Sequence, residues 1–162
     1  MVSADALIEV PDGLGVAEAV TVLHDGTTAL LAIRTAAIKP GDWVLVNAAG
    51  GSLGSMLVPM AKAAGARVIG AARGERKLAR VREWGADVTV DYTEPGWGAR
   101  ALAATEGHGV DVVFDGAGGE QGQTAYGLTA PGGRFLAYGH PAVVSSNPAP
   151  TIAGSSSSES WT

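Results

Sequence analysis

The sequence has 162 residues, of which 46% are apolar, and this is enough for one domain with a sizeable core. It contains no cysteine, so disulfides, thiolate nucleophiles and thiolate zinc sites are excluded. The formal net charge of −5 argues against a nucleic-acid partner and against an anionic membrane surface.

The first forty residues predict an N-terminal segment that carries short helices. Residues 1–5 have neither the basic region nor the apolar stretch of a signal peptide, and no apolar run looks long enough to cross a bilayer. We therefore expect a cytoplasmic protein with no membrane partner. Within this segment, residues 6–10 resemble a short strand, and residues 16–23 and 27–37 resemble two helices.

Strands and helices alternate regularly between residues 41 and 140, which we take as one domain. The sequence WVLVN at 43–47 is typical of a parallel strand buried on both faces. The predicted strands are 43–47, 67–71, 88–91, 110–114 and 134–138, and the predicted helices are 53–64, 75–84, 97–105 and 120–128. This alternation predicts an α/β fold in three layers, with a doubly wound parallel sheet of five strands that lacks the last strand of a complete Rossmann sheet.

Residues 141–162 differ in composition from the rest of the chain. Serine, proline and alanine dominate them, and apolar periodicity is almost absent. Such composition predicts a disordered tail. A functional linker and a remnant of a shifted reading frame both remain open for it.

A glycine-rich loop follows the first predicted strand and opens the first helix of the alternation. In it, Gly50 and Gly51 permit a close backbone approach, Gly54 permits tight packing of helix on strand, and the amides of Ser52, Leu53 and Gly54 point at the position of a phosphate. The strict G-x-G-x-x-G pattern is not met, because Ala49 stands at its first glycine. The loop predicts dinucleotide binding, and the alternative is a tight turn without a ligand.

The residues after the second predicted strand bear on which dinucleotide binds. Proteins that bind NAD place an acidic residue here for the ribose 2′-hydroxyl, whereas this chain has Ala72 followed by Arg73. A basic side chain at this point can accept a 2′-phosphate, so NADP(H) is favoured over NAD(H). Arg76, further along, is equally explained as a solvated residue of a helical turn.

The histidines lack the spacing of a metal site. His24, His108 and His140 are far apart in sequence, and we interpret them as loop residues. We expect no bound metal.

Several phrases, in their order and spacing, resemble the cofactor domain of medium-chain dehydrogenases and reductases. The resemblance runs from about residue 4 to residue 139 and is strongest to the zinc-independent quinone oxidoreductase branch. The phrases are VPDG at 10–13, GTTA at 26–29, KPGD at 39–42, the glycine loop, AKAAGA at 61–66, EWGAD at 83–87, GVDVVFD at 109–115 and PGGR at 131–134.

The resemblance implies further cofactor contacts. The family's lysine and tyrosine near the adenosine 2′-phosphate fall on Lys77 and Tyr92, and its threonine near the nicotinamide falls on Thr28. Its nicotinamide-side loops fall on Gly116 with Ala117, and on Tyr138 with Gly139. Two positions depart from the family's loop, where Ser52 replaces a glycine and Gly50 replaces an alanine.

The resemblance also implies hydride transfer from NADPH to a quinone or enone acceptor, without zinc. Family members carry an upstream catalytic domain that this chain does not contain, so we expect the isolated chain to be inactive and to self-associate as a homo-oligomer. No catalytic residue is identified. The alternative is a nucleotide-binding fragment without enzymatic activity. A short-chain dehydrogenase is excluded, because no lysine lies four residues after Tyr92, Tyr126 or Tyr138.

Overall fold

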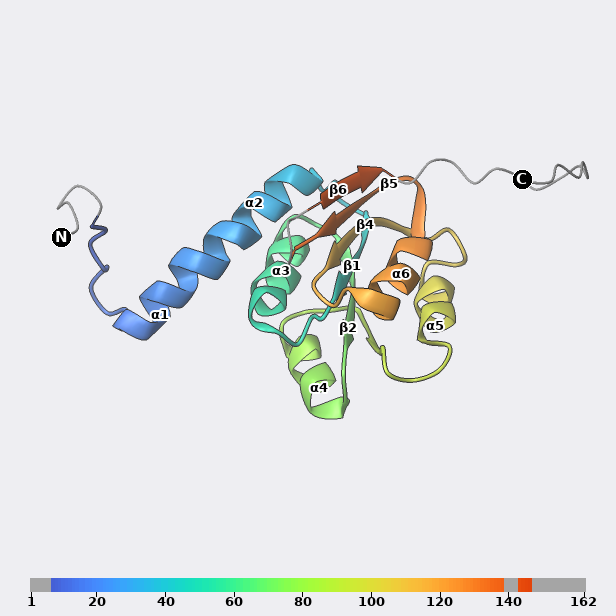
Figure 1. Cartoon of the computed structure of the whole chain (residues 1–162), viewed down its shortest axis with the longest axis horizontal. Coiled ribbons are helices and arrows are strands. Elements are labelled where there is room, and N and C mark those ends of the chain that lie inside the picture. The colour runs from blue at the N-terminus through green and yellow to red at the C-terminus, as the bar shows by residue number, and fades with distance from the viewer. Residues whose placement is uncertain (1–6, 139–142, 147–162) are drawn as a thin grey trace, which may run out of the picture.

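The computed structural model describes residues 7–138 and 143–146, which form a layered α/β domain with a helical N-terminal extension (Figure 1). The elements in chain order are α1 (Val16–Thr21), η2 (Val22–Gly26), α2 (Thr27–Ala36), β1 (Trp43–Asn47), α3 (Ser52–Ala63), β2 (Arg67–Ala72), α4 (Glu75–Glu83), β3 (Val88–Asp91), α5 (Trp97–Ala104), β4 (Val110–Asp115), α6 (Gly119–Gly127), β5 (Thr129–Ala137) and β6 (Val143–Ser146).

The strands form one sheet in the order β3-β2-β1-β4-β5-β6, and the first five are parallel. This confirms the doubly wound five-stranded sheet. The chain moves outward from β1 to β2 and β3, and then returns to the other side of β1 with β4. The strand order therefore reverses between β1 and β4, which is where open α/β sheets bind ligands at their carboxyl ends.

Helices cover both faces of the sheet and enclose two cores. On one face α2, α3 and α4 pack on the sheet around buried residues such as Leu57, Val81 and Phe114. On the other face α5 and α6 pack around Leu45 and Ile69. Side chains of this size stabilise the fold by about 1.5–3 kcal/mol each when fully buried. The three predicted layers are confirmed.

Two predicted strands differ from the structure. Residues 7–10 form no strand, and Leu7 and Ile8 are about 70% exposed (71% and 70%), because no neighbouring strand pairs with them. β5 begins at Thr129 instead of residue 134. Thr129 pairs with Val110, and the register shift before Val112 accommodates the predicted turn at 130–133 as an irregularity inside the strand.

The end of the described chain also differs from expectation. Residues 143–146, which we predicted to be disordered, form β6 and pair antiparallel with the edge strand β5. This pairing occupies backbone groups that β5 would otherwise leave open at the edge of the sheet. The prediction is wrong for these four residues, and the remainder of the predicted tail lies outside the described residues.

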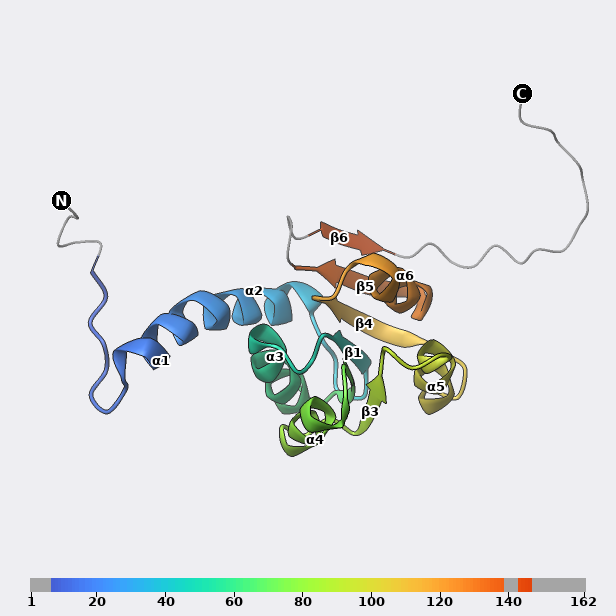
Figure 2. The ribbon, with the colours of Figure 1, turned by 60° about the horizontal axis from the view of Figure 1, so that its bottom comes forward.

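The two predicted N-terminal helices form one continuous helical segment, Val16–Ala36, joined through the π-helical turn η2. Its first half extends away from the sheet domain in both ribbon views (Figures 1 and 2). By length and composition this segment could cross a membrane, since its mean hydropathy is 1.3, so our expectation that no such run exists was wrong. Its second half nevertheless belongs to the domain, because Ala29 and Ala36 are fully buried in the core beside α3.

Candidate functional site

The glycine loop turns the chain sharply from β1 into α3. The Ala48 backbone is left-handed (φ 64°), and its carbonyl accepts a hydrogen bond from the Gly51 amide at 3.0 Å. A Cβ added to Gly54 would lie 2.6 Å from the Ala49 carbonyl carbon, so only glycine lets α3 start this close to the strand. At Gly51 the nearest atom to such a Cβ is the Ala48 oxygen at 3.2 Å, and the residue is exposed. Gly54 therefore serves packing, and Gly51 faces open space.

The amino end of α3 offers free hydrogen-bond donors. Gly51 is the N-cap and supplies no side-chain cap. Ser55 is the first residue of α3 whose amide donates a backbone hydrogen bond, to the Gly51 carbonyl at 3.0 Å. Among the described residues, the amides of Ser52, Leu53 and Gly54 have no acceptor. Three free amides, backed by the dipole of a twelve-residue helix, suit a phosphate group.

The predicted 2′-phosphate residues lie around the carboxyl ends of β2 and β3. Arg73 follows β2 directly and is exposed, and Tyr92 follows β3, whose last residue pairs with Ala72. Lys77 lies in the first turn of α4, over the glycine loop: a Cβ added to Gly50 would lie 2.8 Å from the Lys77 Cβ. The fold thus brings Arg73, Lys77 and Tyr92 to one end of the sheet, beside the loop.

A carboxylate missed by the sequence analysis lies at the same place. Asp91 ends β3, and its side chain accepts hydrogen bonds from the Gly74 amide (2.7 Å) and from the Thr93 amide and hydroxyl (2.9 and 2.6 Å). Hydrogen bonds from Thr93, and after them that from Gly74, lower the pKa of Asp91. A carboxylate from the neighbouring strand thus lies beside the end of β2, where it accepts a hydrogen bond from Gly74, the residue after Arg73. Only the pairing of Ala72 with Asp91 reveals it.

The predicted nicotinamide-side residues fall into two groups. Gly116 and Tyr138 touch, because a Cβ on Gly116 would lie 3.0 Å from the Tyr138 ring carbon that bears the hydroxyl. The Ala117 amide donates to Asp115 at 3.1 Å, and burial, followed by the charge of Asp115, raises the pKa of Tyr138. Thr28 is half-buried on α2 and belongs to a separate element. Gly139 lies outside the described residues.

A second polar residue missed by the sequence analysis ends β1. Asn47 is fully buried opposite Asp115 of β4, to which its amide nitrogen donates at 2.9 Å. Its side-chain oxygen is buried and has no hydrogen-bond partner among the residues that the structure describes. Buried acceptors without a partner are rare in proteins and call for an explanation. This one lies at the point where the strand order reverses. The sequence offered one signal for this residue, because Asn47 is a polar residue at the end of an otherwise apolar strand.

A further contact joins the N-terminal helical segment to the glycine loop. The Ser52 hydroxyl donates to the Asp25 carboxylate, which also accepts from His24 Nδ1 at 2.8 Å. The hydrogen bond from Ser52, and after it the hydrogen bond from His24, lowers the pKa of Asp25. His24 lies in the π-helical turn η2, so our interpretation of it as a loop residue was wrong.

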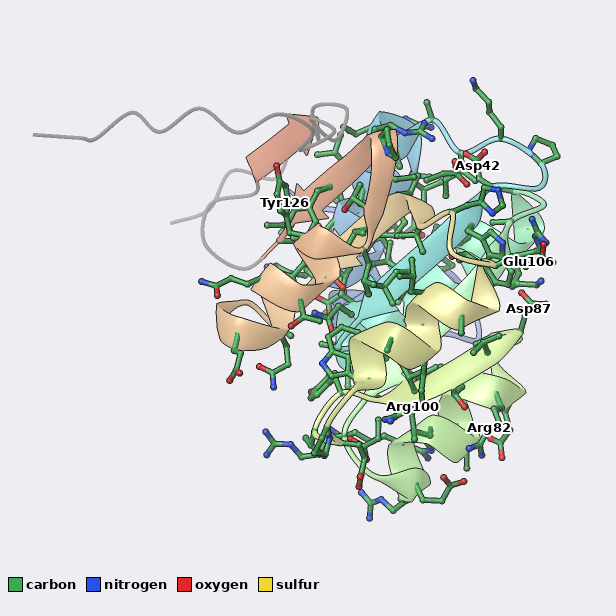
Figure 3. The ribbon with its side chains drawn as sticks, turned by 90° about the vertical axis from the view of Figure 1, so that its right-hand side faces the viewer. Asp42, Arg82, Asp87, Arg100, Glu106 and Tyr126 are labelled. Atoms are coloured by element: carbon green, nitrogen blue, oxygen red, sulfur yellow. The ribbon has the colours of Figure 1, made fainter. Side chains whose placement is uncertain are left out.

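A cavity lies at the other end of the sheet, where the parallel strands begin. In Figure 3 the labelled Asp42, Asp87 and Glu106 lie along one side of the domain, at the amino ends of the strands. A cavity of about 340 Å³ opens at this edge, and Arg67 stacks on Trp43 there at 4.4 Å. It lies away from the glycine loop and from the carboxyl ends, where α/β sheets bind their ligands.

No group of three or more potential metal ligands gathers within residues 7–138 and 143–146. His108 lies in a turn at the amino-terminal edge, and His140 lies outside the described residues.

Comparisons with known proteins point in one direction. Residues 52–158 match the protein family described as zinc-binding dehydrogenase. A 2-haloacrylate reductase from Burkholderia sp is 36% identical over 140 residues, which cover 85% of this chain and 42% of that protein.

Solved structures agree with that match. A quinone oxidoreductase from Pseudomonas syringae superposes with a TM-score of 0.76 at 32% identity, covering 82% of this chain and 41% of that one. An NAD-dependent alcohol dehydrogenase superposes with a TM-score of 0.73 at 38% identity, covering 78% of this chain and 37% of that one. The chain spans about two fifths of the length of these relatives.

Proposed function

Because the chain belongs to the zinc-binding dehydrogenase family of medium-chain oxidoreductases, we propose that it is the NADP(H)-binding module of a quinone oxidoreductase-like enzyme. The observation that carries this proposal is the amino end of α3. The amides of Ser52, Leu53 and Gly54 have no acceptor among the described residues, and they adjoin Gly51, which faces open space. The donors and the close approach fit a pyrophosphate.

The remaining cofactor contacts are assigned from the sequence and their places in the fold. Gly50 and Gly51 line the pyrophosphate with the three amides. Arg73, Lys77 and Tyr92 hold the adenosine 2′-phosphate. Thr28, Gly116, Ala117, Tyr138 and Gly139 surround the nicotinamide.

NADP(H) is proposed over NAD(H) on the chain's own residues. Arg73 is exposed and forms no ion pair with the described residues, so its guanidinium is available to a phosphate dianion. Asp91 opposes this with its negative charge, but three hydrogen bonds already engage both of its oxygens. One structural relative is named an NAD-dependent alcohol dehydrogenase, so the proposal rests on Arg73, Lys77 and Tyr92 and not on the fold alone.

The proposed reaction reduces a quinone or an enone. The names of the relatives, a quinone oxidoreductase and a 2-haloacrylate reductase, support an acceptor with an electron-poor conjugated double bond. The bound nicotinamide supplies the hydride, and the protein orients it and the acceptor. The chemistry is proposed to proceed without zinc, because the sequence has no cysteine and its histidines are far apart. We place the protein in the cytoplasm and propose that it forms a homo-oligomer.

A second candidate function is nucleotide binding without turnover. It is favoured by the share of the relatives that this chain spans, about two fifths. Hydride transfer needs donor and acceptor held about 3–3.5 Å apart, and much of the rate comes from that positioning. A single domain leaves the acceptor to chance collision, so the isolated chain is proposed to be inactive as a catalyst.

The test is NADPH-dependent quinone reduction by the purified chain, alone and with the remaining domain of a relative added in trans or by fusion. We expect no saturable turnover alone and partial activity after the addition. Saturable turnover by the chain alone, abolished by Gly51→Val, would contradict the proposed inactivity. No activity in any combination, despite tight NADPH binding, would favour the second candidate.

A further inference from the structure

The π-helical turn η2 interrupts the α-helical geometry of the N-terminal helical segment. It contains His24 and Asp25 and interrupts the segment where it meets α3, since a Cβ on Gly26 would lie 3.9 Å from the Met56 sulfur. Single π turns inside α-helices are frequent at functional sites.

Asp25 connects the turn to the glycine loop and orients the imidazole. Its carboxylate accepts from Ser52 on one oxygen and lies 2.8 Å from His24 Nδ1 on the other. An ionised carboxylate can only accept hydrogen bonds, so Nδ1 carries the proton. The other ring nitrogen, Nε2, is then free. The His24 side chain is 85% exposed, whereas that of Asp25 is 25% exposed. The imidazole is therefore open to solvent, and the carboxylate that orients it is partly buried.

His24 is also tied to a residue assigned to the nicotinamide. The Thr28 hydroxyl donates to the His24 carbonyl at 3.0 Å, which places the two residues one helical turn apart, an axial rise of about 5.4 Å. Ser52 belongs to the pyrophosphate loop. His24 therefore lies one helical turn before Thr28, and its neighbour Asp25 contacts Ser52 of the loop.

Two other titratable groups among the predicted nicotinamide-side residues and their neighbours, Tyr138 and Asp115, are poor proton donors. Burial, and then Asp115, raises the pKa of Tyr138, and its hydroxyl points to the Asn47 carbonyl at 3.4 Å. Asp115 accepts from Asn47 and from the amides of Ala117 and Gly118. His108 lines the cavity at the opposite edge.

We propose that His24 is the catalytic acid of the reduction, with Asp25 and Ser52 as positioning residues. The inference rests on the proposed function. The acceptor receives two electrons and one proton as a hydride from the nicotinamide, which leaves an anion on the quinone or enone oxygen. The acting form of the ring carries a proton on each nitrogen. The His24 Nε2–H bond breaks, its proton forms the new O–H bond, and the electron pair stays on Nε2, which leaves a neutral ring whose Nδ1–H still faces Asp25. A hydronium ion from the solvent then returns a proton to Nε2, and the Asp25 carboxylate balances the charge of the ring.

The first test is proton NMR of the 162-residue chain, whose three histidines are assigned with His24→Asn and His108→Asn. Adding NADPH should shift the His24 ring signals and give a nuclear Overhauser contact to the nicotinamide protons. The fragment 2′-phospho-ADP-ribose, which lacks the nicotinamide, should give no such nuclear Overhauser contact. Asp25→Asn should alter the ring tautomer seen in the nitrogen spectrum.

The second test fuses the chain to the remaining domain of a relative, adds NADPH and benzoquinone, and measures the slope of the NADPH oxidation rate against quinone concentration. His24→Asn should lower this slope roughly tenfold, below the 10²–10⁴-fold typical of a well-positioned acid, because the activity of the fusion is only partial. His108→Asn is the matched control and should leave it unchanged.

The outcomes separate this inference from the proposed function. If NADPH binds and neither the His24 signals nor the slope responds, His24 is not the acid and the cofactor site stands. If NADPH does not bind the native chain, the proposed function fails and this inference fails with it.

Discussion

Lys77 lies directly over Gly50, so closely that a Cβ on the glycine would come within 2.8 Å of the lysine Cβ. This contact joins the first turn of α4 to the loop between β1 and α3. It packs the aliphatic stem of Lys77 against the loop. The absence of a side chain at residue 50, where the family carries alanine, permits this approach.

The first prediction concerns cofactor choice. The double change Arg73→Ala and Lys77→Ala should weaken NADPH binding and leave NADH binding nearly unchanged, because only NADPH carries the 2′-phosphate. Charge-assisted hydrogen bonds contribute about 1.5–3 kcal/mol, and exposure places the loss at the lower end, roughly tenfold in Kd. Isothermal calorimetry measures both affinities. Arg76→Ala, an exposed change in the same helical turn, is the control. Equal losses for both cofactors would refute the assignment.

The second prediction separates two glycines of the loop. Gly51→Val should abolish binding of both cofactors with little loss of stability, because its Cβ meets only the Ala48 oxygen at 3.2 Å. Gly54→Ala should instead destabilise the fold by about 1–3 kcal/mol, as overpacking does, because its Cβ would lie 2.6 Å from backbone. Urea unfolding and calorimetry on both variants test this. A folded Gly51→Val variant that binds normally would show that the loop is only a turn.

The third prediction concerns acid stability. Hydrogen bonds from Thr93 and Gly74 hold the pKa of Asp91 below its usual value of 3.8. The stability that they contribute is therefore complete above that value and is lost as the pH falls through the lower, folded-state pKa. Asp91→Asn should destabilise the chain at pH 7 and flatten the fall in stability below about pH 4. Urea midpoints measured from pH 7 to pH 2 test it, with Glu94→Gln as control. An unchanged acid limb would contradict the role given to Asp91.

The fourth prediction concerns self-association through the exposed helical segment. Val16, Val20 and Leu31 are 73%, 62% and 64% exposed, and such apolar surface favours association. The chain should elute from a sizing column as a dimer or larger species. The double change Val20→Glu and Leu31→Glu should yield a monomer whose sheet domain unfolds at nearly the same temperature. A native chain that sediments as a monomer at all concentrations would refute this.

The sequence predicted the sheet well because each element carries a strong local signal. The apolar strand at 43–47 and the helix opened by Gly51 both lie where the pattern placed them. The features it missed depend on pairing between distant segments. Asp91 reaches the end of β2 only through the register of β3, and Asn47 faces Asp115 across sixty-eight residues of sequence. β6 forms from a stretch with little apolar periodicity, because the edge of β5 offers it backbone partners.

The site was predicted in part for the same reason. The glycine loop is local and its free amides follow from its place between strand and helix. The link from Ser52 to His24 through Asp25 depends on a π-helical turn that no residue pattern in this sequence announces. The assignments of Arg73, Lys77 and Tyr92 to the cofactor remain predictions.

The most direct test of the account is a calorimetric titration of the 162-residue chain with NADPH and with NADH. We predict one saturable NADPH site per chain, tighter than that for NADH and absent in a folded Gly51→Val variant. Absence of binding by either dinucleotide would contradict the central claim, and NADH binding as tightly as NADPH would contradict the proposed cofactor choice.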